Sequence, residues 1–156
     1  MIIRPAIEND RQKIFSLVSE IKNFSAGEVE LAREVIGEAF DLENSGYHLM
    51  VAVDQREALC GFICFGPVPI TEKSWDLYWI AVSPRQARRG IGSQLLAAME
   101  NQLRAVEGIR VYVDTSSLAE YSAARSFYER HGYDVACVLP DFYRAGDDKI
   151  IFVKAL

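Results

Sequence analysis

The sequence contains few cysteines and histidines, and their spacing excludes a scaffold built on disulfides or zinc. Cysteine occurs three times, as Cys60, Cys64 and Cys137, and an odd number cannot pair completely. Cys60 and Cys64 lie four residues apart within one predicted strand, which is a poor geometry for a disulfide. The two histidines, His48 and His131, lie far apart in the sequence, and neither belongs to a metal-ligand spacing. We therefore expect buried free thiols and no metal ion.

Long hydrophobic runs and an excess of positive charge are also missing. No apolar run approaches the ~20 residues that span a bilayer, and the N-terminal segment lacks the features of a signal peptide. The 17 lysines and arginines are outnumbered by 22 aspartates and glutamates, which gives a net charge of -5. Nucleic-acid binding depends mostly on basic side chains that neutralise phosphates. These absences predict a cytoplasmic protein that binds neither a membrane nor nucleic acid.

The composition is that of one folded domain. Of the 156 residues, 50% are apolar and 25% are charged, and no internal repeat or flexible linker divides the chain. We therefore expect a single domain over residues 1–156. Hydrophobic periodicity predicts the order β-α-α-β-β-β-α-β-α-β-β, an α+β (mixed α/β) fold with a sheet of mixed direction. The strands are expected near 2–5, 48–54, 58–70, 74–83, 109–114, 133–139 and 149–155, and the helices near 9–22, 25–43, from 90 onward, and 119–131.

The second predicted helix has a recognisable start. Ser25 is placed to cap it, and Glu28 three residues later completes the pattern of a capping box. The helix is expected to run to about Glu43 and to end near Asn44-Ser45-Gly46, because glycine favours helix termination.

The stretch from Trp79 to Leu96 is typical of an anion-binding loop. A strand runs into a loop with three arginines and no acidic residue, and Gly90-Ile91-Gly92 then opens an amphipathic helix. Unpaired N–H groups and the positive end of the helix dipole favour phosphate there, and glycine allows its oxygens to approach the backbone. The stretch lacks the Gly-Lys-Ser/Thr of a P-loop, and Leu95 replaces the third glycine of a dinucleotide fingerprint. The alternative interpretation is an arginine-rich turn in solvent.

A second segment, residues 121–133, is a predicted helix that ends at a glycine. Ala124 and Tyr128 lie one turn apart on one face, so that a thin ligand can run past the small residue to the phenol. The alternative is that Phe127 and Tyr128 are both aromatic core contacts. We expect this for Phe127, whereas Tyr128 stays open because a phenol prefers a polar partner or water.

Together, the two segments resemble the motifs of the GNAT superfamily of acyl-CoA-dependent N-acyltransferases. The first is similar to its CoA-binding motif Gln/Arg-x-x-Gly-x-Gly/Ala, and the second to its C-terminal motif Asn-x-x-Ala-x-x-Phe-Tyr-x-x-x-Gly-Phe/Tyr. The element order matches too, so the resemblance covers nearly the whole chain and implies a GNAT-like domain with a mostly antiparallel sheet. Ala87 stands where the family usually has Gln or Arg, and Tyr121 where it often has Asn. Because the loop binds mainly through backbone amides, we expect Ala87 to be tolerated, while the effect of Tyr121 stays open.

The resemblance implies acetyl-CoA as the co-substrate and no metal. The strand at Ile80 and Val82 is expected to pair its backbone with the pantetheine arm, and the amides from Arg88 to Ser93 to hold the pyrophosphate. The residues expected to bind CoA are Ile80, Ala81, Val82, Arg88, Arg89, Gly90, Ile91, Gly92 and Ser93. The implied activity is that of an N-acetyltransferase, in which a primary amine attacks the thioester directly. The alternative is a non-catalytic acyl-CoA sensor or regulatory domain.

The resemblance also implies catalytic roles. Tyr128 occupies the position of the usual general acid, and a phenol with a pKa of about 10 can protonate the departing thiolate without being ionised at neutral pH. The backbone N–H of Val82 is the expected donor to the oxyanion. Asp76 matches the strand position where some members carry a glutamate base, and we expect it to act through a water because it is shorter.

The assignment of the base has alternatives. Strand alternation predicts one shared face for Asp76, Tyr78, Ile80 and Val82. Asp76 can also simply begin a strand in solvent, in which case the base is a water or one of Glu38, Glu43 and Glu72.

The acceptor is expected to be the amine of a small molecule or a peptide. Two aromatic-rich stretches, 75–79 and 140–149, are candidates for its pocket, and Asp141, Asp147 and Asp148 suit a cationic amine. The alternative for the second stretch is a hairpin turn with solvated charges. The apolar last strand, at 150–153, is either a central strand of the monomer or the pairing edge of a homodimer.

Overall fold

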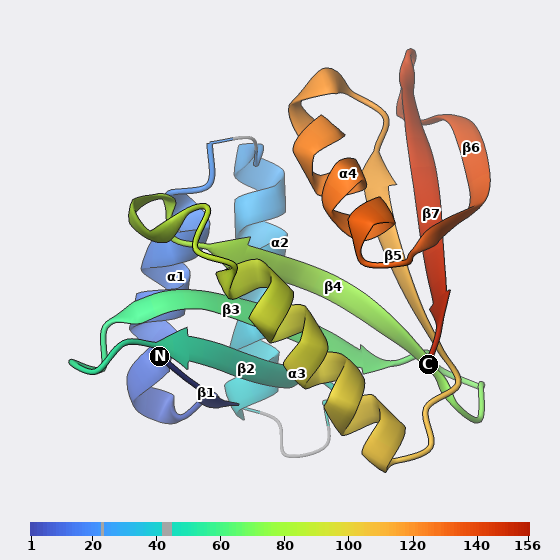
Figure 1. The fold of residues 1–156 in the computed structure, drawn as a ribbon. Helices are drawn as coiled ribbons and strands as arrows, with labels where there is room; N and C mark the ends of the chain where they lie inside the picture. Colours follow the sequence, from blue (N-terminus) through green and yellow to red (C-terminus); the bar gives the residue numbers. More distant parts are fainter. Residues whose placement is uncertain (23, 42–44) are drawn as a thin grey trace.

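A computed structural model describes residues 1–22, 24–41 and 45–156, and contains a seven-stranded sheet with helices on both faces (Figure 1). The observed order of strands and helices confirms the predicted order. None of the helices in the described ranges combines the length and hydrophobicity needed to cross a membrane. The strands are β1 (Ile2–Pro5), β2 (His48–Val53), β3 (Leu59–Pro67), β4 (Ser74–Val82), β5 (Arg110–Ser116), β6 (Asp134–Arg144) and β7 (Asp147–Ala155). The helices are α1 (Arg11–Ser19), α2 (Ala26–Asp41), α3 (Ile91–Ala105) and α4 (Ser122–Arg130), with short 3-10 turns η1 (Glu8–Asp10), η2 (Pro84–Gln86) and η3 (Ala119–Tyr121).

The sheet is antiparallel except at one pair of strands. The strand order is β1-β2-β3-β4-β5-β7-β6, and among the strands of the described ranges only β4 and β5 run parallel to each other. The pairing of these two strands is also short. Residues 74–76 of β4 pair with residues 110–112 of β5, and in the described structure the pairing ends there. Beyond these residues the two strands diverge, and Figure 1 shows them as the arms of a V.

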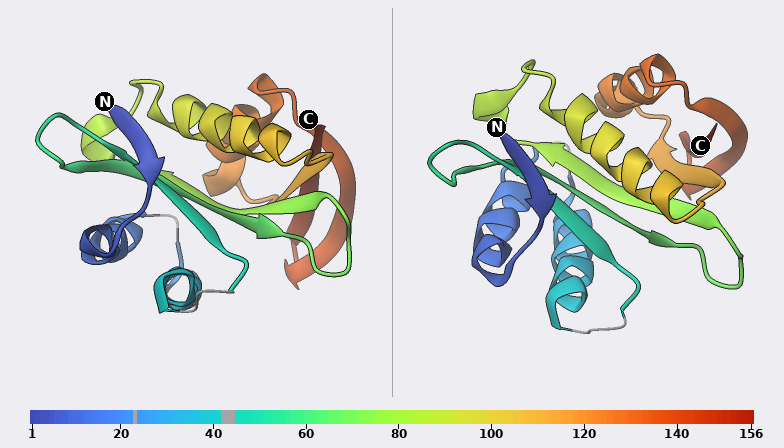
Figure 2. Two further views of the ribbon diagram at one scale, coloured as in Figure 1. Left: turned by 90° about the horizontal axis from the view of Figure 1, so that it is seen from below. Right: turned by 60° about the horizontal axis from the view of Figure 1, so that its bottom comes forward.

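Apolar side chains cover both faces of the sheet. In the left view of Figure 2, α1 and α2 lie below the sheet and α3 lies above it. The lower layer buries Ile14, Val18 and Ile36 completely. The upper layer buries residues of α3 at helical spacing, so that one stripe of the helix faces the strands. These residues are Leu95, Leu96, Met99 and Leu103.

The second helix begins as predicted. The backbone N–H of Ser25 donates to Glu28 Oε2 at 2.7 Å, and the backbone N–H of Glu28 donates to Ser25 Oγ at 3.2 Å. These two hydrogen bonds form the capping box. The predicted helix end falls partly on Glu43 and Asn44, which lie outside the described residues; the last described helical residue is Asp41.

The C-terminal strand lies inside the sheet. β7 pairs with β5 on one side and with β6 on the other, so the structure shows the central-strand alternative within the monomer. One edge of the sheet is β6. It extends past the predicted end at 139 to Arg144 and is followed by the turn at Gly146, where φ is 78°. Because the whole of β6 is exposed, Cys137 lies in solvent, whereas Cys60 and Cys64 are buried. The expectation that all three thiols are buried is therefore wrong for Cys137.

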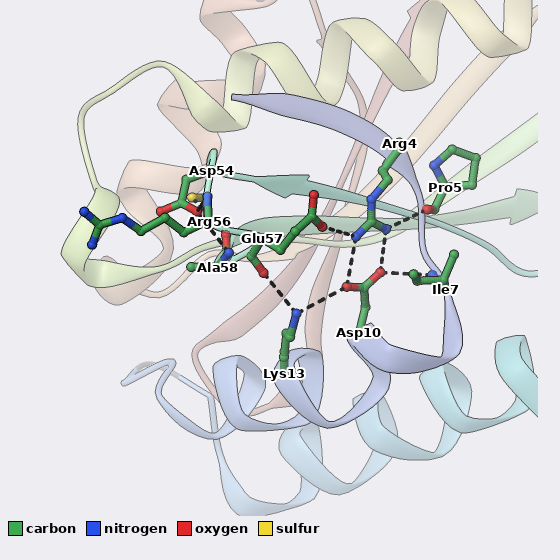
Figure 3. Close-up of polar contacts among 10 residues, drawn as sticks. Arg4, Pro5, Ile7, Asp10, Lys13, Asp54, Arg56, Glu57 and Ala58 are labelled. Atoms are coloured by element: carbon green, nitrogen blue, oxygen red, sulfur yellow. Dashed lines mark hydrogen bonds and ion pairs between the residues drawn. The ribbon is translucent and has the colours of Figure 1, made fainter.

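Arg4 on β1 ties the first strand to the start of α1 (Figure 3). Its Nη1 donates to Asp10 Oδ2 at 2.6 Å, and its Nη2 donates to Glu57 Oε2 at 3.0 Å. The Asp10 side chain has no exposed surface, and its Oδ2 also accepts the backbone N–H of Ile7 at 3.0 Å. Burial acts to raise the pKa of Asp10, but the hydrogen bonds from Arg4 and Ile7 outweigh it and hold the pKa below its ordinary value.

We expect Asp10→Asn to lower the free energy of unfolding by about 2 kcal/mol at neutral pH, as for a hydrogen bond to a charged group. Because the folded-state pKa is depressed, this contribution is present above the unfolded pKa of about 3.9 and is lost as the pH falls through the folded value. Urea unfolding of both proteins at about pH 7 and about pH 3 measures the difference. A difference that stays constant between the two pH values would contradict the ionised state of Asp10. Glu57→Gln is the exposed control and should change stability by less than about 0.5 kcal/mol.

Candidate active site

The divergence of β4 and β5 opens a cleft of about 960 Å³. Residues 78–82 of β4 and residues 114–116 of β5 line its two sides. Helix α4 contributes Ala124 and Tyr128, while the start of α2 and the β6–β7 hairpin form the other walls. The cleft therefore brings the two motif-bearing segments of the sequence, the end of β4 and helix α4, to one place.

The backbone of β4 is unpaired on the cleft side. Residues 79–82 pair with β3 along one edge, but beyond residue 76 their other edge has no strand partner among the residues that the structure describes. Such an edge presents free N–H and C=O groups to any extended ligand that carries amides. The predicted cofactor residues Ile80, Ala81 and Val82 all lie on this edge and line the cleft.

A β-bulge at Tyr78 changes which side chains of β4 share a face. Cys64 of β3 pairs with Trp79, but the next residue of β3 pairs with Leu77, so Tyr78 is the extra residue. Leu77, Ile80 and Val82 consequently all contact the α3 side of the sheet, although their numbers differ in parity. Tyr78 packs on the α1/α2 side instead.

The bulge corrects the prediction that Asp76, Tyr78, Ile80 and Val82 share one face. Simple alternation holds only without an extra residue, and the bulge reverses it between Leu77 and Ile80. Since Asp76 precedes Leu77, alternation places it on the side of Tyr78, away from Ile80 and Val82.

The loop before α3 adopts a conformation that exposes backbone N–H groups. Arg88 and Gly90 have positive φ values of 62° and 72°, and Gly90 is the N-cap of α3. No side chain in the described part of the chain caps this helix, so the N–H groups of Ile91, Gly92 and Ser93 have no cap acceptor. A Cβ atom on Gly92 would lie 3.4 Å from the Phe127 ring and 3.7 Å from Val82. The helix start therefore packs directly against the end of β4 and against α4.

His131, to which the sequence analysis assigned no role, connects α3 and α4. Its Nδ1 lies 2.7 Å from the carbonyl oxygen of Phe127, and its Nε2 lies 2.9 Å from Ser93 Oγ. The centroids of the Phe127 and His131 rings lie 4.3 Å apart. Phe127 also packs on the core, as predicted. These contacts fix the hydroxyl of Ser93 in the first turn of α3.

Tyr128 combines the two interpretations that its position in the sequence allowed. Only 6% of the residue is exposed. Its ring centroid lies 5.5 to 5.8 Å from the ring centroids of Phe127, Tyr133 and Phe152. It also lines the cleft, and no hydrogen bond to its hydroxyl occurs within the described ranges. Burial raises the pKa of Tyr128 well above its ordinary value, so the side chain stays a neutral phenol that can donate a proton.

The predicted bases are not among the residues that line the cleft. Asp76 is half-buried; burial and the charge of Asp114 raise its pKa, while Lys149 opposes the rise. Glu38 and Glu72 also lie away from the lining, and Glu43 is outside the described residues. No cluster of three His, Cys, Asp or Glu side chains suited to a metal occurs in the described part of the chain.

The sequence missed a carboxylate that lines the cleft. The hydroxyl of Tyr121 donates to Glu28 Oε1 at 2.7 Å, which links the start of α2 to η3. The pKa of Tyr121 is raised by burial and then by this contact with Glu28. The capping-box pattern identified Glu28 only as a helix-start residue, because no local spacing signals a partner 93 positions away.

Residues 45–135 match the family model of the acetyltransferase (GNAT) domain. A search of curated proteins with this sequence finds no match. Among solved structures, a protein from Desulfovibrio desulfuricans assigned to the GNAT family is 35% identical, with a TM-score of 0.92 over 99% of this chain and 98% of that chain.

Two more distant structures share the fold. An aminoglycoside 6'-N-acetyltransferase in complex with coenzyme A is 21% identical, with a TM-score of 0.76 over 99% of this chain and 97% of that chain. The ribosomal-protein-S18-alanine N-acetyltransferase of Escherichia coli is 18% identical, with a TM-score of 0.77 over 99% of this chain and 92% of that chain. The family model covers more than half of the sequence, and the Desulfovibrio structure covers nearly all of it, so this chain belongs to the GNAT family of acetyltransferases.

Proposed function

We propose that this protein transfers the acetyl group of acetyl-CoA to an amine, with Tyr128 as the general acid. The observation that carries the proposal is the cleft between β4 and β5, which holds an unpaired backbone edge and a buried phenol together. The unpaired start of α3 lies against the same strand end, through the contact of Gly92 with Val82.

The residues present suit coenzyme A. Its pantetheine arm carries amides that can pair with the free backbone of 80–82, and its pyrophosphate is an anion that the N–H groups at the start of α3 attract. Arg88 and Arg89 add exposed positive charge beside that helix start. The complex of the aminoglycoside 6'-N-acetyltransferase with coenzyme A supports this assignment.

The chemistry follows from the groups around Val82 and Tyr128. A neutral amine nitrogen bonds to the thioester carbonyl carbon, and the carbonyl electron pair moves to oxygen, where the N–H of Val82 is available as a donor. The carbon–sulfur bond then breaks, and Tyr128 gives its proton to the sulfur. The amine loses one proton to a water in the cleft, and an equivalent proton returns through water to Tyr128 and restores the phenol.

Thiol release tests this function. The protein is mixed with acetyl-CoA and amines of several classes, and free CoA thiol is followed over time, while calorimetry with CoA measures binding separately. We expect both binding and turnover. Binding without turnover on any amine would favour the acyl-CoA sensor instead, and no binding would overturn both hypotheses.

A substitution at the start of α3 tests the binding mode. Gly92→Val places extra carbons against the Phe127 ring, which is 3.4 Å from the position of a Cβ atom, so the helix start must shift. We expect CoA affinity to fall about tenfold, which is ~1.4 kcal/mol of binding free energy. Gly92→Ala is the matched control and should have a smaller effect. Equal CoA affinity in all three proteins would contradict phosphate binding at this helix start.

A further inference from the structure

The wall of the cleft formed by the start of α2, η3 and the β6–β7 hairpin is rich in carboxylates. In the described ranges, four acidic and two basic side chains line the cleft, so its net charge is negative. The acidic ones are Glu28, Asp114, Glu120 and Asp147, and the basic ones are Lys22 and Arg144. Asp114 forms an ion pair with Lys149, and Asp147 forms a longer one with Arg144. Within the described ranges, neither Glu28 nor Glu120 forms an ion pair.

Asp147 is a buried carboxylate whose charge is incompletely matched. Only 6% of the residue is exposed, and its Oδ1 accepts the hydroxyl proton of Ser116 at 2.5 Å. Its nearest cationic group is Nε of Arg144, 3.6 Å from Oδ2, on a side chain that is 70% exposed. Of the two alternatives for this stretch, the hairpin turn with solvated charges therefore does not describe Asp147. A carboxylate can accept about four hydrogen bonds, so Asp147 retains capacity for a ligand.

Glu28 is in a similar state. Its two oxygens accept the hydroxyl of Tyr121 and the backbone N–H of Ser25, both at 2.7 Å and both from neutral donors. Its charge is therefore solvated by dipoles but not neutralised by a cation. Glu28 and Asp147 both line the cleft from opposite ends of the chain.

Aromatic side chains share this region. Tyr78, Tyr121 and Tyr143 line the cleft, and an ammonium group is attracted both to aromatic faces and to phenol oxygens. Burial is the largest cause that raises the pKa of Tyr143. The negative charges of Asp114, Asp147 and Glu28 also raise it, so all three carboxylates act on the Tyr143 side chain. By contrast, burial is the cause that raises the pKa of Tyr128. Tyr128 lines the cleft from α4, whereas Glu28 lines it from α2 and Asp147 from β7, so the carboxylates and the phenol of the proposed reaction lie on different walls.

This separation matters for an amine acceptor. The reacting nitrogen must be neutral, and a carboxylate beside it would raise its pKa and keep it protonated. Carboxylates that lie apart from Tyr128 can instead hold a second nitrogen that stays charged throughout the reaction. Carboxylates that keep free acceptor capacity, in a wall with aromatic rings, are the chemistry that recognises such an ammonium group.

We propose that the acceptor is a diamine or polyamine, whose distal ammonium group binds between Glu28 and Asp147 while its other amino group reacts near Tyr128. This inference rests on the proposed acetyl transfer and specifies its substrate class. It adds two specificity residues that touch the acceptor and take no part in the proton transfers.

The test compares diaminobutane with butylamine, which has the same chain and one amino group. Thiol release gives kcat/KM for each, and we expect diaminobutane to be preferred about tenfold or more, mainly through KM. Glu28→Gln and Asp147→Asn should each reduce this preference about tenfold. Glu28→Gln keeps the capping box, because glutamine also serves at that helix position. Glu30→Gln is the matched control, since Glu30 is exposed on the same helix and does not line the cleft.

The outcomes separate the two proposals. If butylamine reacts as well as diaminobutane, or if Glu28→Gln behaves like Glu30→Gln, the diamine site is wrong while acetyl transfer stands. A preference for peptide N-termini over both amines also overturns it. If no amine reacts, calorimetry of diaminobutane into the CoA-saturated protein decides. If diaminobutane binds and its affinity falls in Glu28→Gln, the diamine site is upheld and the proposed acetyl transfer is overturned. If diaminobutane does not bind, both proposals are overturned.

Discussion

Tyr128→Phe is expected to slow acetyl transfer roughly 100-fold, the usual scale of general acid catalysis, with little change in CoA affinity. The phenol is 6% exposed among aromatic rings, so phenylalanine fills the same space and removes only the hydroxyl. Without it, the sulfur leaves as an unprotonated thiolate. Because burial raises the pKa of Tyr128, ionisation of this phenol should not limit the rate of the wild type at neutral or mildly basic pH. Steady-state thiol release and calorimetry with CoA measure the two quantities.

Tyr133→Phe is the matched control for this substitution. Tyr133 is also buried, but its hydroxyl donates to Glu100 Oε1 at 3.2 Å and the residue does not line the cleft. We expect it to lower stability by about 1 kcal/mol, one hydrogen bond, and to leave the rate near that of the wild type. An unchanged rate in Tyr128→Phe would remove Tyr128 from the acid role.

Gly61→Ala is expected to be strongly destabilising for a single added methyl group. A Cβ atom at Gly61 would lie 2.7 Å from the carbonyl oxygen of Ala81 and 3.3 Å from Cα of Val82, so the backbone of β4 must move. An added methyl group that clashes with backbone costs more stability than one that clashes with a movable side chain. We therefore expect the free energy of unfolding to fall by about 3 kcal/mol. For a chain of this size, this loss lowers Tm by roughly 6–12 °C. CoA affinity should fall too, because the displaced strand carries the free edge of the cleft.

Gly37→Ala makes the same chemical change with the opposite expected sign. Gly37 lies inside α2, and a Cβ atom there meets nothing within 4 Å. Alanine in a helix interior is favoured over glycine by roughly 0.5–1 kcal/mol, so this variant should be more stable than the wild type. Thermal unfolding of the two variants side by side checks both signs. If Gly61→Ala is as stable as the wild type, the backbone of β4 can move away from the added methyl group without loss of stability, which would contradict this prediction.

The acceptor side of the cleft depends on contacts that sequence spacing does not encode. Ser25 and Glu28 were identified as a capping box, and this is confirmed. The second role of Glu28 required η3 to pack beside the start of α2, which is a tertiary contact. Asp147 followed a predicted turn and was expected in solvent or in a pocket, and only the pairing of β7 with β5 buries it against Ser116.

The sequence by itself determined the elements of this protein and their order, because hydrophobic periodicity, caps and glycines act over a few residues. It also determined that Gly90-Ile91-Gly92 opens a helix and that Ala124 and Tyr128 share a helix face. Only the tertiary structure decided where β4 and β5 part, because strand pairing depends on residues far apart in the chain. Only the tertiary structure shows the bulge at Tyr78 as well, because the pairing of β4 with β3 determines which residue is the extra one. That extra residue reverses which side chains of β4 face each side of the sheet.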